Sequence, residues 1–141
     1  MQRFIAQGDH HNDLWLVDNS PVFAVFPGGI VGNIPQDMPI YLKVGNKAFG
    51  AKHIEEKHAR WLRKQGFSAA HELVHFKLKQ AGSVYCTETE TKIKIMMRLR
   101  PEAILVMEFF EKPHPHLSVT TIYYHQGALD GEIIGRYPGW R

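Results

Sequence analysis

The chain of 141 residues has a single cysteine, Cys86. One cysteine excludes an intramolecular disulfide and a zinc site built from several cysteines. Long apolar runs are also missing, because the stretch 104–107 is interrupted at once by Glu108, far short of the roughly 20 apolar residues that span a membrane. The N-terminal sequence has no apolar segment typical of a signal peptide. We therefore expect no membrane association and a location in the cytoplasm, either of the producing cell or of a target cell.

A strong charge excess, internal repeats and low-complexity tracts are absent as well. Lys and Arg number 17 against 14 Asp and Glu, a net charge of +3, and apolar residues make up 44% of the chain. This composition is that of an ordinary globular domain, and so small a net charge does not by itself identify a nucleic-acid-binding protein. Histidine is what the chain has in unusual number, with nine residues.

The first part of the chain is rich in short apolar runs separated by turn residues. Runs at 14–17 and 22–26 flank the turn sequence Asp-Asn-Ser-Pro and predict a β-hairpin. We assign this hairpin to an N-terminal β-rich extension, residues 1–38, packed on the same domain. The extension is a candidate for substrate binding, for a dimer contact or for docking a carrier or immunity protein.

Residues 39–141 form the main predicted domain. A short strand at 40–44 precedes two helices, at 51–65 and about 68–81, which are indicated by apolar positions at helical spacing. After the second helix, the spacing of apolar residues changes to a period of two. Alternation over 84–100, followed by apolar segments at 103–112 and 117–125, predicts a three- to four-stranded antiparallel sheet. Helices followed by an antiparallel meander indicate an α+β fold.

The second predicted helix carries the sequence HELVH at residues 71–75. His71 and His75, at i and i+4, share a helix face and can bind zinc, with Glu72 as general base for a bound water. The glycine and third histidine that extend this motif in metzincins are absent, and most of the strand signal follows the helix instead of preceding it. A zinc metallopeptidase is therefore the alternative hypothesis, and two histidines in ordinary structural positions are the simpler interpretation.

The first predicted helix carries a second histidine pair, His53 and His58. Five residues separate them, about 140° around a helix, so their rings converge only if His53 lies in the first turn. At a helix N-terminus the dipole disfavours the charged imidazolium, which suits a base that works near neutral pH. The alternative is that His58 is a core residue between Ile54 and Trp61.

Basic and hydroxyl side chains accompany this pair. They occupy one face of the same helix, one face of the alternating segment 84–100, and the last predicted strand. On that strand Thr121, Tyr123 and His125 share a face with Val119. The candidate substrate-binding residues are Lys43, Lys57, Arg60, Lys92, Arg98, Thr120 and His125. Such a set fits metal-free RNA cleavage, in which a neutral histidine deprotonates the ribose 2′-hydroxyl, a second acid protonates the leaving oxygen, and cations stabilise the phosphoryl charge.

The order and spacing of these elements resemble a known nuclease superfamily. Residues 39–45 (PIYLKVG), followed by Phe49-Gly50-x-x-His53-Ile54-x-x-x-His58, are similar to phage-associated and toxin-type members of the barnase–EndoU–colicin–RelE-like (BECR) superfamily. Residues 118–123 (SVTTIY) resemble the Thr- and aromatic-bearing strand of these proteins and the Ser/Thr-x-x-Tyr element of EndoU enzymes. The resemblance covers about residues 39–126 and implies a metal-independent endoribonuclease that needs no cofactor.

Carried onto matching positions, the resemblance implies a catalytic set of His53, His58, Lys94, Thr121 and Tyr123, with Thr120 as an alternative to Thr121. The resemblance does not assign the catalytic cation to a single position of this chain. Lys43 and Lys92 also qualify, and Lys94 is preferred for its central place on the alternating strand. The implied partners are RNA, with transfer RNA as a candidate, and an immunity or inhibitor protein. A non-catalytic RNA-binding or inhibitory module on the same fold is the third hypothesis.

Overall fold

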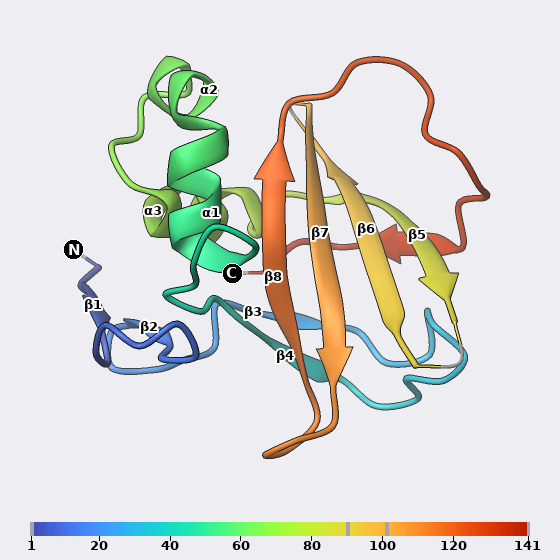
Figure 1. Ribbon diagram of the computed structural model, residues 1–141. Coiled ribbons are helices and arrows are strands. Elements are labelled where there is room, and N and C mark those ends of the chain that lie inside the picture. The colour runs from blue at the N-terminus through green and yellow to red at the C-terminus, as the bar shows by residue number, and fades with distance from the viewer. Residues whose placement is uncertain (1, 90, 101, 141) are drawn as a thin grey trace.

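The computed structural model describes residues 2–89, 91–100 and 102–140, and its fold is α+β (Figure 1). The helices are α1 (Gly50–Lys57), α2 (Ala59–Lys64) and α3 (Ala70–Lys77). The strands are β1 (Phe4–Ala6), β2 (Trp15–Val17), β3 (Ala24–Phe26), β4 (Met38–Tyr41), β5 (Gly82–Glu88), β6 (Ile93–Leu99), β7 (Ala103–Phe110), β8 (His116–Tyr123) and β9 (Gly135–Tyr137).

The main sheet has seven strands in the order β3-β4-β8-β7-β6-β5-β9. Its centre is the antiparallel meander β5–β8, and β4 joins β8 in a parallel pair. The prediction of a three- to four-stranded sheet was therefore wrong. The meander was visible as alternation, whereas β3, β4 and β9 contain only three or four residues each, too few for a periodic signal.

The predicted helix over 51–65 is two helices, with the break at His58. This residue has φ −124° and ψ 25°, and it is both the C-cap of α1 and the N-cap of α2. The apolar stripe of the sequence runs through the break because Ile54 and Leu62 are both buried. Periodicity reports which side chains are buried, and the backbone can change direction without altering it.

The predicted pairing of 14–17 with 22–26 was also wrong. β2 pairs with β1 in a separate two-stranded sheet, and β3 pairs with β4. The turn between them exists, since Val17 and Ser20 form a bridge and both Asp18 and Asn19 have positive φ. Because β3 pairs with β4 across the predicted boundary at 38/39, part of the N-terminal segment belongs to the main sheet.

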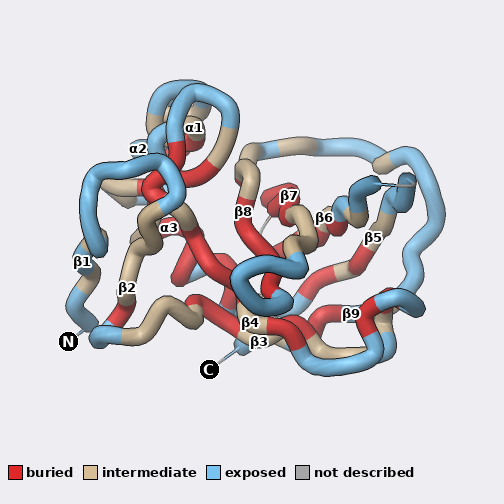
Figure 2. Tube along the Cα trace, turned by 60° about the horizontal axis from the view of Figure 1, so that its bottom comes forward, coloured by how far each residue is buried: buried red, intermediate tan, exposed pale blue. Residues whose placement is uncertain are grey.

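One face of the meander is the core, and the helices lie beside β8 (Figures 1 and 2). Alternate side chains from the strands, such as Ile95 and Met97, form one buried cluster with Ile54 of α1 and with Leu73 and Val74 of α3. The opposite face of the same strands carries polar side chains such as Lys94 and Glu108 beside apolar ones such as Ile104 and Val106. Among the described residues, none of the helices combines the length and apolar character needed to span a membrane.

The loop 27–37 between β3 and β4 reaches the far side of the sheet. Asn33 Nδ2 donates a 2.8 Å hydrogen bond to Glu88 Oε2 at the end of β5. Ile30 lies against Gly135 of β9, where a Cβ atom would come within 2.7 Å of Ile30 Cγ2. The sheet therefore curls until its two ends are bridged by this loop, which gives it the character of a partly closed barrel.

Candidate active site

The face of the sheet opposite the core carries two rows of side chains, each running across neighbouring strands. Strand register pairs Lys94 with Glu108, Glu108 with Ser118, and Phe110 with His116. We call Lys43, Ser118, Glu108 and Lys94 the polar row, and Tyr41, His116 and Phe110 the aromatic row. Because alternate residues of a strand share a face, the two rows lie side by side.

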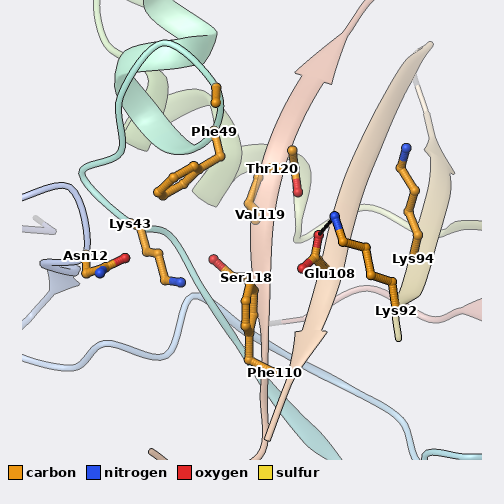
Figure 3. A pocket seen from close by; sticks show the side chains of 11 residues that line it. Asn12, Lys43, Phe49, Lys92, Lys94, Glu108, Phe110, Ser118, Val119 and Thr120 are labelled. Carbon is orange, nitrogen blue, oxygen red and sulfur yellow. Dashed lines mark ion pairs between the residues drawn. The ribbon is translucent and has the colours of Figure 1, made fainter. Parts of the chain in front are cut away.

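The polar row lines a cavity of about 450 Å³ (Figure 3). Its wall also contains Asn12, Ala48, Phe49, Lys92, Phe110, Val119 and Thr120. All three lysines proposed as the catalytic cation, Lys43, Lys92 and Lys94, therefore line this cavity, which we call the lysine cavity. Lys92 Nζ lies 3.9 Å from Glu108 Oε1, and both side chains are partly exposed, so this ion pair is weak.

Lys43 is the most enclosed of the three lysines. Its Nζ lies 4.1 Å from the centroid of the Phe110 ring and 5.6 Å from that of Phe49. Burial lowers the pKa of Lys43, and the nearby carboxylate of Glu108 partly offsets this effect. A cation held between aromatic faces is weakly solvated, which favours binding of a phosphate over binding of water.

A β-bulge on β8 determines where its threonines point. Val106 pairs with Thr121 and the next residue, Met107, pairs with Val119, so Thr120 is the extra residue. The sequence-based placement of Val119 on the face of Thr121 was wrong because the bulge shifts the alternation, and Ser118 takes that place. Thr120 lines the lysine cavity, and among the described residues the buried Thr121 Oγ1 has no hydrogen-bond partner.

The proposed histidines and Tyr123 form a continuous series of rings. Ring centroids are 6.0 Å apart for His53 and His58, 5.8 Å for His58 and Tyr123, and 6.4 Å for Tyr123 and His125. The His58 and Tyr123 rings are stacked. His53 is the fourth residue of α1, and the helix breaks at His58. This break lets two side chains that are five residues apart come together.

Each histidine of the pair is held differently. His53 Nδ1–H donates a 2.7 Å hydrogen bond to the carbonyl of Lys47, which leaves Nε2 as the ring nitrogen for chemistry. Burial is the main cause of a lowered pKa at His58, and the positive charges of His53 and Lys57 lower it further. His58 is therefore neutral at neutral pH and able to accept a proton.

A second basic hollow, of about 560 Å³, is formed mainly by the helices and has His58 in its wall. It is lined by Lys57, His58, Arg60, Trp61, Lys64, Gln65 and Tyr124. Lys57 and Arg60, both proposed substrate-binding residues, are exposed there. One histidine of the pair thus belongs to the basic hollow on the helices. Tyr123, on which His58 stacks, follows Thr120 of the lysine cavity along β8.

Arg98 is placed differently from the other proposed substrate-binding residues. Its guanidinium donates hydrogen bonds to the carbonyls of His125 and Gly127 and lies 3.2 Å from Glu102 Oε2. These contacts tie the end of β8 and the loop that follows it to β6, and they favour a structural role for Arg98. In the part of the chain that the structure describes, the buried His125 Nε2 has no hydrogen-bond partner.

The histidines of the HELVH sequence pack against the small N-terminal sheet. The His71 ring is stacked on Trp15 at 3.9 Å, and the His75 ring lies edge-on to Phe4 at 5.4 Å. Burial lowers the pKa of both histidines. Within residues 2–89, 91–100 and 102–140, no group of three or more His, Cys, Asp or Glu side chains is arranged to hold a metal ion. The packing favours a structural role for this pair.

The sequence-based reasoning missed the aromatic row and two members of the polar row, Ser118 and Glu108. Strand register would have revealed most of both rows, because it pairs Phe110 with His116 and Glu108 with Ser118. It places Tyr41 opposite Ser118, and the Tyr41 ring stacks on His116, two residues before Ser118. The register of the parallel β4–β8 pair cannot be predicted from the sequence of either strand alone, because the two strands lie far apart in the chain.

Comparisons with known proteins give no further guide. No protein-family model matches the chain, and no curated protein or solved structure matches it.

Proposed function

We propose that the protein is a metal-independent endoribonuclease of toxin-like or phage-encoded type, with transfer RNA as a candidate substrate. The observation that supports the proposal is the series of rings His53–His58–Tyr123. His58 lines the hollow on the helices, and Tyr123 lies on β8 three residues after Thr120, which lines the lysine cavity. Two separated clusters of cations match a polyanion with regularly spaced phosphates. In this proposal the histidine pair acts on one phosphate of a chain that contacts both clusters.

The reaction needs one proton acceptor and one proton donor. His58, neutral at working pH, takes the proton from the ribose 2′-hydroxyl, and the 2′-oxygen attacks the adjacent phosphorus. The bond from phosphorus to the 5′-oxygen breaks, and His53 in its protonated form delivers a proton from Nε2 to the leaving oxygen. This assignment reverses the role of base that the sequence suggested for His53, because burial lowers the pKa of His58. The products are a 2′,3′-cyclic phosphate and a free 5′-hydroxyl, and the balance requires no metal or cofactor.

Cations and hydroxyls complete the proposed site. Lys43 and Lys94, with the Thr120 hydroxyl, bind the oxygens of the phosphoryl group from the lysine cavity. Tyr123 stacks on His58 and fixes the plane of its ring. Lys57 and Arg60 hold a neighbouring phosphate in the second hollow. Donors aimed at the place where negative charge develops supply much of the rate enhancement in such a reaction.

The test is cleavage of bulk transfer RNA by the purified chain in the presence of EDTA. We expect 2′,3′-cyclic phosphate ends, and a loss of about 10²- to 10⁴-fold in rate for His58→Ala and for His53→Ala. His10→Ala is the matched control, because His10 is an exposed histidine of the N-terminal segment that belongs to neither hollow. Lys52→Ala, on an exposed position of α1, serves the same purpose for Lys57→Ala.

Two outcomes would overturn the proposal. Activity that survives both His53→Ala and His58→Ala would remove the histidine pair from the mechanism. RNA binding without turnover by the wild-type chain, under all salt conditions tried, would make the protein a binding or inhibitory module. Expression in bacteria gives a second readout, since we expect growth arrest by the wild-type chain and none by His58→Ala.

A further inference from the structure

The aromatic row encloses a cavity that the proposed cleavage reaction does not use. The His116 ring is stacked between Tyr41 at 5.0 Å and Phe110 at 5.5 Å, with interplanar angles of 26° and 17°. These three residues come from β4, β8 and β7, so the sheet itself holds the stack rigid. Beside them is a cavity of about 450 Å³, within the range of small-molecule sites.

Polar groups converge on the same cavity. The Tyr41 hydroxyl and His114 Nε2 share a hydrogen bond of 2.6 Å, and His116 Nδ1–H donates one of 2.8 Å to the carbonyl of His114. The His114 residue is exposed, and its ring lies edge-on to Tyr41. Gln7, Asn12 and Lys112 also line the cavity. Flat apolar surfaces with hydrogen-bonding groups at their edge suit a planar heterocycle.

Lys43 connects this cavity to the proposed site. It lines both the aromatic cavity and the lysine cavity, and its ammonium group lies over the Phe110 ring. A phosphate bound at Lys43 would therefore lie at the mouth of each. The two cavities adjoin each other, because Asn12, Lys43 and Phe110 line both.

We infer that the cavity formed by Tyr41, Phe110, His114 and His116 is a nucleobase-binding subsite, which takes the base of the nucleotide whose phosphate is held at Lys43. The inference rests on the proposed ribonuclease function and adds to it a means of selecting the nucleotide beside the cleaved bond. Stacking on the rings retains any base, whereas hydrogen bonds to His114 and to the amides of Gln7 and Asn12 distinguish one base from another.

Binding of mononucleotides tests the inference without cleavage. The probes are adenosine, guanosine, cytidine and uridine 3′-monophosphate, with ribose 5-phosphate as the ligand that lacks a base. We expect the nucleotides, but not ribose 5-phosphate, to shift the ring-proton NMR signals of His114 and His116. Affinity should differ by several-fold or more among the four bases.

Variants separate base binding from phosphate binding. His114→Ala should weaken nucleotide binding about 10-fold and leave ribose 5-phosphate binding unchanged. Lys43→Ala and Phe110→Leu should weaken the binding of both ligands, because the Phe110 ring also holds the Lys43 ammonium group. The exposed His114 can be replaced without disturbing the core, so its variant remains informative if Phe110→Leu unfolds. In RNA cleavage, His114→Ala should raise KM or change the preferred base at the cut, with a smaller effect on kcat.

The failures of the two proposals are distinguishable. If the nucleotides shift neither histidine and His114→Ala cleaves RNA with the wild-type KM and base preference, the subsite is overturned while the ribonuclease stands. If mononucleotides bind as expected but RNA is not cleaved, the ribonuclease fails and the base-binding cavity stands. A fall in kcat alone for His114→Ala would also overturn the subsite, because it would place His114 in the chemistry.

Discussion

The pKa of His58 is the property on which the proposed chemistry depends most directly. Burial, His53 and Lys57 all lower it, so the base is already neutral at a pH where an ordinary histidine, with a pKa near 6.5, is partly protonated. Activity that needs neutral His58 should therefore persist to a lower pH than 6.5. The acidic limb of kcat/KM reports this ionisation in the free enzyme.

Removing the charge of Lys57 tests that assignment. Since Lys57 lowers the pKa of His58, Lys57→Gln should raise it and move the acidic limb of kcat/KM to higher pH. An NMR titration of the His58 ring measures the same shift without relying on activity. Lys52→Gln, on the same helix, is the control and should leave both unchanged. A Lys57→Gln enzyme with an unmoved acidic limb would assign the base elsewhere.

At the scale of elements, the entry to α1 determines where the histidine pair stands. Gly45 and Gly50 both have positive φ, and their backbones are in contact. The N–H groups of Ala51 and Lys52 donate to the carbonyls of Lys43 and Val44, which joins the helix to the segment that directly follows β4. The lysine cavity and the first turn of α1 are therefore parts of one rigid unit.

Gly50→Ala should disrupt this unit. A Cβ atom at Gly50 would lie 2.7 Å from the Lys43 carbonyl oxygen, on a backbone with φ of +80°. We expect a loss of stability beyond the roughly 1–2 kcal/mol of the conformational strain alone, together with a fall in RNA cleavage. Gly66→Ala is the matched control, because φ is +87° there and nothing lies within 4 Å. Equal effects of the two substitutions in urea denaturation would show that the contact with Lys43 is unimportant.

These elements also show what the sequence can predict. Strong alternation located the sheet meander, and helical spacing located α1 and α3, because burial repeats within one element. The break at His58, the bulge at Thr120 and the pairing of β3 with β4 depend on contacts between distant segments. The histidine pair was therefore predicted from local spacing, whereas the aromatic row, which three strands assemble, was not.

For the molecule as a whole, buried histidines make stability depend on pH. Burial lowers the pKa of His71, His75 and His116 in the folded state. Between that lowered pKa and about 6.5 the unfolded chain binds more protons, so the free energy of unfolding falls as the pH falls below about 6.5. Urea denaturation at pH 7.5, 6 and 5 should show this decline.

The contribution of His75 to this pH dependence can be separated from that of the other histidines by comparing a variant with the wild type. His75→Phe keeps a ring among Phe4 and Phe23 and removes a titrating group, so its stability should decline less than that of the wild type between pH 7.5 and 5. The difference between the two curves cancels the contribution of the carboxylates. Parallel curves would mean that protonation of His75 does not lower the free energy of unfolding.

The curled sheet has a consequence for partners. Its two edge strands, β3 and β9, are three residues long, and the loop 27–37 bridges them. Partner proteins that add a strand to a sheet need a long free edge to pair with. An inhibitor of this molecule would find only a few backbone groups to pair with at either edge. An inhibitor that instead bound the lysines and rings lining the two cavities would compete directly with the proposed substrate.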